Sequence, residues 1–331
     1  NFLYFLTIVN DARRLMRLPA LLWMAPKRKE VSRTLIPDDQ ARDLKLALKQ
    51  AWEAVRNTWA QNDAIRAEAN RRLGGEAPMR LCEKEERLLE NWAYFHRIQQ
   101  KTGSILPTTN DLIGDWKSRQ SFSEHGLSLI EMRAMIFPTV EEADAAYHLA
   151  LANSGWNSST LSNLDANSPF LLADHPKDAK QIFLSPDEDT EVTLWADKPR
   201  ARGKKQFCFA LRKNVSSTPM IVERYLVRVH SLREALKKDY QAAVAELVRM
   251  KADCETVEMI AKQVGRVQEI RRGCRSVWLY VDQRSHINWI DGMCLPKYYR
   301  KGTSPTSYLG LVLERLNQRR HQQGKPAISP V

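Results

Sequence analysis

The chain has 331 residues, 43% hydrophobic and 27% charged, which is enough for two ordinary domains and argues against wholesale disorder. Its 51 lysines and arginines outnumber 39 acidic residues and give a net charge of +12. That surplus favours a polyanionic partner, nucleic acid first and an anionic membrane second, with an unpartnered basic surface as the alternative. Five cysteines without a C-x-x-C pair and seven scattered histidines argue against a disulfide framework and against a metal site.

Residues 1–24 are expected to form one or two helices with a basic face. The apolar run at their start is too short to span a bilayer and follows no basic segment, so we predict neither a membrane anchor nor a signal peptide. Because the chain begins with asparagine rather than methionine, we expect it to be a piece of a longer protein. The cations of the basic face and of the linker that follows it are Arg13, Arg14, Arg17, Lys27 and Arg28.

A long helix is predicted next, capped at Asp38 or Asp39 and ended by Gly74 and Gly75. Its apolar residues recur at spacings of three and four, which is the period of a helix with one buried face. They are Leu44, Leu48, Trp52, Val55 and Trp59. Residues 80–101 and 110–120 predict two further helices.

Residues 139–165 carry the strongest local signals of the chain. Thr139 and Glu142 form a capping box, and Gly155 lies where a left-handed residue ends a helix. Asn157 or Ser158 can cap a second, short helix. The apolar stripe of the first helix is Ala143, Ala146, Tyr147, Ala150 and Leu151. The residues alone therefore predict a helix, a tight corner and another helix.

From residue 166 onward the pattern becomes mixed. Strands are predicted at 192–195 and 206–211, around a basic loop at 198–205, and a second small hairpin at 276–281 and 286–290. Helices are predicted at 219–250, 255–270 and 305–321. The fold class is therefore mainly α with short antiparallel β-hairpins (α+β).

The string at 139–165 resembles the region of tyrosine recombinases (phage-type integrases) written T-x-E-E … T-G-L-R-x-x-E-L. The likeness covers residues 137–211, and a weaker one lies at 33–37. It implies that residues 1–30 end a helical core-binding domain and linker. Residues 31–331 would be the front part of a recombinase-like catalytic domain, with helical insertions near 60–130 and 212–290.

Tyrosine recombinases cleave DNA through a covalent phosphotyrosine, while two arginines clamp the phosphate and a hairpin lysine protonates the leaving hydroxyl. The resemblance makes Lys204 or Lys205 the general acid, with Lys198 as the runner-up. The alternative is that this basic hairpin, including Arg200 and Arg202, only contacts phosphate.

Asn157 stands where the family has its first clamp arginine. An asparagine can donate to a phosphate but brings no charge and no bidentate fork, so Asn157 is either a phosphate contact or simply an N-cap. The string His230-Ser-Leu-Arg233 matches the family's H-x-x-R, but it falls too soon after the hairpin and inside a helical run, so we reject it. None of Tyr280, Tyr298, Tyr299 and Tyr308 is assigned as nucleophile, and we expect the second half of the active site beyond Val331.

Further basic clusters with aromatic neighbours suit a DNA backbone; their members are Arg271, Arg272, Arg275, Arg300 and Lys301. The resemblance thus implies site-specific DNA recombination or integration, by a multimer on double-stranded DNA in the cytoplasm, at the nucleoid. The alternatives are a catalytically degenerate, DNA-binding or architectural relative, and an unrelated basic helical protein. We expect no cofactor, no metal and no membrane partner.

Overall fold

A computed structural model describes residues 2–19, 36–75, 81–112, 129–167, 191–197, 205–290 and 308–328 of the chain. It divides into two compact units, Asn1–Asp39 and Gln40–Val331. The first unit contains helix α1 (Phe2–Leu15), which confirms a helix at the start of the chain. Past its end, Arg17 adopts a left-handed backbone with φ of 55°, and Arg13 Nε donates to the carbonyl of Pro19 at 2.8 Å. These contacts close the chain back on the helix.

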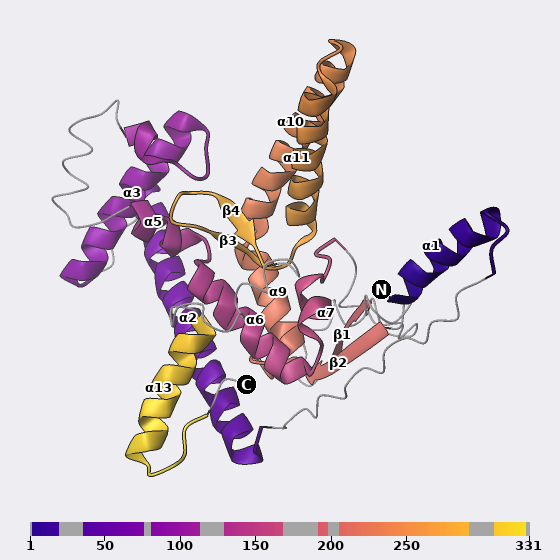
Figure 1. The fold of residues 1–331 in the computed structure, drawn as a ribbon. Helices are drawn as coiled ribbons and strands as arrows, with labels where there is room; N and C mark the ends of the chain where they lie inside the picture. Colours follow the sequence, from indigo (N-terminus) through magenta and orange to yellow (C-terminus); the bar gives the residue numbers. More distant parts are fainter. Residues whose placement is uncertain are drawn as a thin grey trace. The chain divides into compact units, whose positions relative to one another are not determined.

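The second unit is mostly helical and contains two separate two-stranded antiparallel sheets (Figure 1). This confirms the predicted fold class. The helices are α2 (Asp38–Leu73), α3 (Glu83–Thr102), the 3₁₀ helix η1 (Thr109–Leu112), α5 (Leu129–Ile136), α6 (Val140–Ser154), α7 (Ser158–Ser162), α9 (Thr218–Arg228), α10 (His230–Ala252), α11 (Val257–Arg275) and α13 (Tyr308–Gln322). The strands are β1 (Glu191–Asp197), β2 (Lys205–Leu211), β3 (Leu279–Val281) and β4 (Ile287–Trp289).

The local signals around α6 are confirmed. The Thr139 hydroxyl accepts from the backbone N–H of Glu142 at 3.3 Å, and the Glu142 carboxylate accepts from the N–H of Thr139 at 3.0 Å. Gly155 ends the helix with φ of 63°, where a side chain would strain the backbone. Every residue from Ala143 to Ala150 is buried, so α6 is a central helix of the unit.

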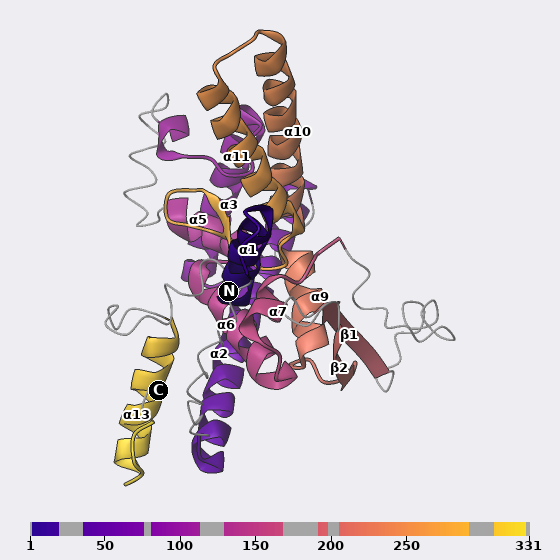
Figure 2. The same ribbon diagram turned by 45° about the vertical axis from the view of Figure 1, so that its right-hand side comes forward.

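The single helix predicted at 219–250 is wrong, because the chain forms two helices, α9 and α10, that meet at Val229. This valine is fully buried, and its φ and ψ of −95° and 7° leave the helical region. Packing of Val229 and Leu232 into the core therefore overrides the local helix preference. The predicted helix at 110–120 is described only as η1, and its remainder lies outside the described residues. Helices α10 and α11 lie side by side as an antiparallel pair (Figure 2).

The main core is built around Trp278, whose ring lies 5.5 Å from that of Tyr147 and 5.3 Å from that of Tyr225. Its indole N–H donates to the carbonyl of Leu161 at 2.9 Å, and the Tyr225 hydroxyl donates to the carbonyl of Leu279 at 2.7 Å. These bonds satisfy the polar ends of two large buried rings. Together with the ring contact between Tyr147 and Trp278, they tie α6, α7, α9 and β3 into one body.

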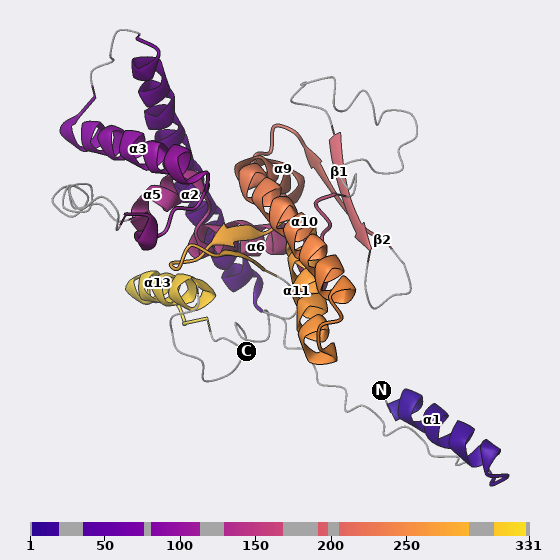
Figure 3. The same ribbon diagram turned by 90° about the horizontal axis from the view of Figure 1, so that it is seen from above.

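A second, smaller core lies between the C-terminal half of α2, α3 and α5, which are grouped together in Figure 3. Its largest members are Trp92 and Phe95 on α3 and Met132 on α5. Helix α2 contributes to both cores and so connects them. None of the helices in the described part of the chain combines the length and apolar character needed to cross a bilayer.

Candidate functional site

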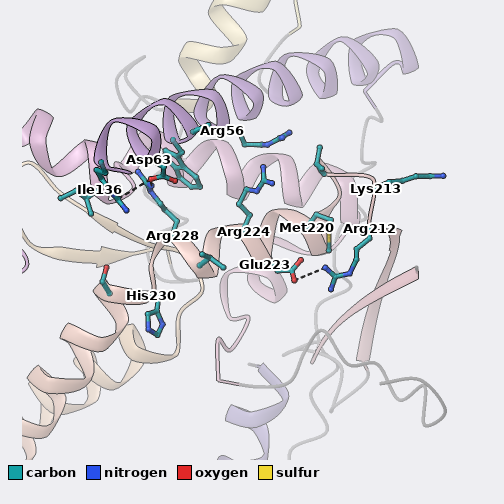
Figure 4. A pocket seen from close by; sticks show the side chains of 16 residues that line it. Arg56, Asp63, Ile136, Arg212, Lys213, Met220, Glu223, Arg224, Arg228 and His230 are labelled. Atoms are coloured by element: carbon teal, nitrogen blue, oxygen red, sulfur yellow. Dashed lines mark hydrogen bonds and ion pairs between the residues drawn. The ribbon is translucent and has the colours of Figure 1, made fainter. Parts of the chain in front are cut away.

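Helices α2 and α9 line the two sides of a groove of about 950 Å³ (Figure 4). The lining residues of each helix recur at spacings of three and four, so each helix presents one continuous stripe. From α2 they are Arg56, Trp59, Ala60, Asp63 and Arg66; from α9 they include Met220, Glu223, Arg224, Val227 and Arg228. The turn between β2 and α9 adds Arg212, Lys213 and Val215, α5 adds Ile136, and α10 adds His230 and Ser231.

The groove is strongly cationic. Among the described residues that line it, five arginines and a lysine face only two carboxylates. Asp63 is shared by Arg228 at 2.6 Å and Arg66 at 3.5 Å, and Glu223 accepts from Arg212 at 3.5 Å. The two carboxylates therefore leave a surplus of positive charge along the groove.

Arg56 and Arg224 carry that surplus most directly. Neither forms an ion pair in the part of the chain that the structure describes, and Figure 4 shows the two side chains reaching into the same space from α2 and α9. Partial burial lowers the pKa of Arg56, and the neighbouring charge of Arg224 lowers it further, while Glu53 opposes the shift. Arg56 Nε is buried without an acceptor. A buried donor without a partner costs free energy, which an anion bound in the groove would recover.

Arg228 forms the floor at one end. Its guanidinium lies 5.1 Å from the ring centroid of Trp59, donates to Asp63 and donates to the carbonyl of Met135 at 2.7 Å. Trp59 in turn packs against Tyr225 of the main core, with ring centroids 6.0 Å apart. The floor is therefore held rigidly by the core, which preorganises the cations above it.

Five arginines on and near two facing helices, with only two carboxylates among them, suit a ligand with closely spaced negative charges. A guanidinium binds phosphate oxygens through a planar fork of donors, and a nucleic-acid strand presents one phosphate per nucleotide. No carboxylate–histidine or thiol set that could hold a metal ion occurs among the described residues. The chemistry that the groove supports is therefore polyanion binding.

The predicted hairpin is confirmed as β1 paired antiparallel with β2, in the register Trp195 opposite Phe207. Most of its predicted basic residues (Lys198, Arg200, Arg202 and Lys204) lie outside the described residues, as do Lys27, Arg28, Arg300 and Lys301. Lys205 opens strand β2.

Asn157 is exposed at the N-cap of α7. Its carbonyl accepts from the N–H of Thr160 at 2.9 Å, but its side chain makes no capping hydrogen bond. The indole N–H of Trp156 donates to the carbonyl of Phe207 at 3.2 Å, so the corner that carries Asn157 lies against β2. The two parts of the resemblance are thus adjacent in space, and the Asn157 side chain is accessible.

The other predicted cations of the second unit do not line the groove. Arg271 and Arg272 are exposed near the end of α11, and Arg275 pairs with Asp165 at 2.6 Å. In the first unit, Arg14 pairs with Asp11 at 3.8 Å. Arg271, Arg272 and Arg275 are therefore not part of the groove lining.

In the H-x-x-R string, His230 is exposed and lines the groove. Arg233 is buried, and it donates to the carbonyl of Ser276 at 2.9 Å. Burial lowers the pKa of Arg233, and this residue does not line the groove. Tyr280, on strand β3, is half-buried.

Sequence reasoning missed the groove arginines. The stripe Met220, Glu223, Arg224, Val227, Arg228 has helical spacing and could have been found from the sequence. Nothing in the sequence, however, indicates that this stripe faces Arg56 on a helix far away along the chain. The chain matches no protein-family model, and comparison with curated proteins and with solved structures finds none that is similar.

Proposed function

We propose that this chain binds double-stranded DNA, with the groove between α2 and α9 holding the phosphate backbone. The observation that carries the proposal is the pair Arg56 and Arg224, which lie together without an ion pair among the described residues. The net charge of +12 adds long-range attraction to the same partner.

The test is the salt dependence of binding to a duplex oligonucleotide, followed by fluorescence anisotropy. Replacing both arginines in R56Q/R224Q removes two phosphate contacts. We expect about 100-fold weaker binding at low salt, at roughly tenfold per charged contact. The slope of log K against log salt should become shallower by about 1.8.

The matched control is R87Q/K101Q, which removes the same charge from two exposed positions on α3. We expect less than a twofold change in affinity for this control. An equal loss in both double variants would assign binding to net charge alone, and no loss in R56Q/R224Q would remove the groove from the proposal.

A second proposal concerns chemistry: that the DNA held in the groove is cleaved and rejoined through a phosphotyrosine, as in tyrosine recombinases. It is supported by the contact between Trp156 and Phe207, which places the Asn157 corner beside the β1–β2 hairpin. Lys204 or Lys205 would protonate the leaving hydroxyl, and a multimer at the nucleoid would bring two sites together. Arg13, Arg14, Arg17, Arg271, Arg272 and Arg275 would add backbone contacts.

That chemistry is tested with the full natural reading frame, read past Val331, and a nicked suicide DNA substrate. A covalent protein–DNA band on a denaturing gel, lost when one downstream tyrosine becomes phenylalanine, is the expected result. The variants K204A and K205A should each be compared, since loss of a general acid costs about 10²- to 10⁴-fold in rate. Salt-sensitive binding without any band would instead favour a degenerate, DNA-binding or architectural relative.

A further inference from the structure

The β1–β2 hairpin has one face that packs on the core and an outer face that is only partly covered, since Thr193 on the outer face of β1 is buried while its partner Phe209 is exposed. On the packed face, Val192, Leu194 and Ala196 are all buried. Successive side chains of a strand point to opposite faces, so the alternate residues of both strands lie on the outer face. An antiparallel sheet with one solvated face ordinarily carries polar side chains there.

The outer face of β2 is instead apolar and aromatic. Phe207 is 44% exposed, Phe209 60% and Leu211 42%. The two phenylalanine rings are nearly parallel, with an interplanar angle of 12° and centroids 6.3 Å apart. Trp195, half-buried, lies directly opposite Phe207 in the register. We call Trp195, Phe207 and Phe209 the aromatic face.

Strand β2, which carries two rings of the aromatic face, runs directly into the turn that lines the cationic groove. The chain passes from Leu211 to Arg212 and Lys213, which both line the groove. Flat rings next to guanidinium and ammonium groups match the two parts of a nucleotide, since bases stack on aromatic rings and phosphates bind the cations. An apolar protein contact on the rings would not by itself account for the adjoining cations.

We infer that the aromatic face stacks the unpaired bases of a single-stranded DNA segment whose phosphates the groove arginines hold. The inference rests on the proposed DNA-binding function and extends it from duplex to locally opened DNA. Stacking on a ring tolerates any base, so we expect affinity for single strands with little sequence preference. Phe209, the more exposed ring, contributes most.

The test compares an oligo(dT) single strand with a hairpin duplex by fluorescence anisotropy, using the variant F207L/F209L. Leucine keeps the surface apolar but removes the flat ring, so it separates stacking from apolar contact. We expect about 30- to 100-fold weaker binding to the single strand, at several-fold to tenfold for each ring, and less than a twofold change for the duplex. The matched control is Y94L, which removes a half-buried ring from α3. It should leave both affinities unchanged.

Several results would overturn the inference. They are an unchanged single-strand affinity in F207L/F209L, an equal loss for single strand and duplex, and a change only in oligomeric state by light scattering, which would mark a protein interface. If F207L/F209L does not fold by circular dichroism, F209L alone, at the more exposed position, gives the same comparison. Duplex binding lost in R56Q/R224Q with single-strand binding intact in F207L/F209L would overturn this inference alone. Wild-type protein that binds neither DNA would overturn the proposed function as well.

Discussion

Arginines occupy two kinds of place in this chain, and the hydrogen-bond acceptors around them differ. In the core, Arg133 donates to the carbonyl of Leu129 at 2.9 Å and to the Ser285 hydroxyl, and Arg233 donates to the carbonyl of Ser276. In the groove, Arg56 and Arg224 have neither an ion pair nor a side-chain hydrogen bond among the described residues. The Nε atoms of Arg56 and Arg233 are both buried without an acceptor, so the two kinds of arginine differ in the partners of their remaining guanidinium nitrogens. Acceptors supplied by the fold mark a cation that holds the fold together. An arginine for which the fold supplies no such acceptor is available to bind a ligand.

The largest expected effect on stability extends this comparison to a carboxylate. Asp144 is buried on α6 and, like Arg56, has no ion pair among the described residues. Burial, and to a smaller extent Glu141, raise its pKa from 3.8 to about 7. The folded state therefore binds this proton more tightly than the unfolded chain does. The stability that Asp144 contributes is complete below pH 4 and is lost as the pH rises to about 7, by about 4 kcal/mol.

Urea unfolding between pH 4 and pH 8, for wild type and D144N, measures this effect. The wild type should lose stability across the range, and D144N should lose markedly less. Burial also raises the pKa of Glu142, but that contribution is present in both proteins and cancels in the difference. Identical pH profiles would show that the fold tolerates this charge.

The next effect is expected at Arg233. Its replacement by alanine leaves a cavity and removes the donor to Ser276, so we expect a loss of about 3 kcal/mol in the free energy of unfolding. Affinity for DNA at a temperature where the variant is folded should not change. Weaker DNA binding by folded R233A would contradict the separation of the two kinds of arginine.

A smaller effect of opposite sign is expected at Arg56. The variant R56Q removes the repulsion from Arg224 and a charge that burial disfavours, so the free protein should become slightly more stable, by roughly 0.5 kcal/mol or less because solvent screens the partly exposed charge. The same variant should bind DNA less tightly. Thermal unfolding with and without duplex measures both, and a destabilised free R56Q would place Arg56 among the arginines that support the fold.

A further small effect is expected at Asp63, whose side chain is 53% exposed and pairs with Arg66 and Arg228. The variant D63N frees both cations for phosphate, so duplex affinity should rise about threefold to tenfold. Exposed ion pairs contribute less than about 1 kcal/mol, which limits the stability lost. Anisotropy titrations of D63N beside wild type test this, and a fall in affinity would mean that Asp63 orients the arginines.

Local signals predicted the elements that local interactions determine. The capping box at Thr139, the glycine stop at Gly155 and the apolar period of α2 each act within a few residues, and each is confirmed. The break at Val229 was missed because it depends on burial in a core built from distant segments. The groove could not be predicted from the sequence for the same reason. The lining residues of α2 form a site only because α9, far away along the chain, packs opposite them.

The candidate residues show the same division. Asn157 could be placed at a helix start from its sequence neighbours, but its free side chain could not be foreseen. Arg271 and Arg272, which were predicted to contact DNA because they are clustered in the sequence, do not line the groove. A cluster of charges in the sequence does not show which surface it joins, whereas the groove collects charges from several elements that lie far apart along the chain.

Helix α9 presents core residues and groove residues in alternation around its axis. Ile221, Val222 and Tyr225 are fully buried, while Arg224 and Arg228 line the groove. Because each helical residue adds about 100° of rotation, inserting one residue ahead of Arg224 would turn the cations away from the groove and expose part of the core. Insertions of three or four residues would nearly restore the phase. In lineages that keep this groove, length variation in α9 should therefore come in whole helical turns.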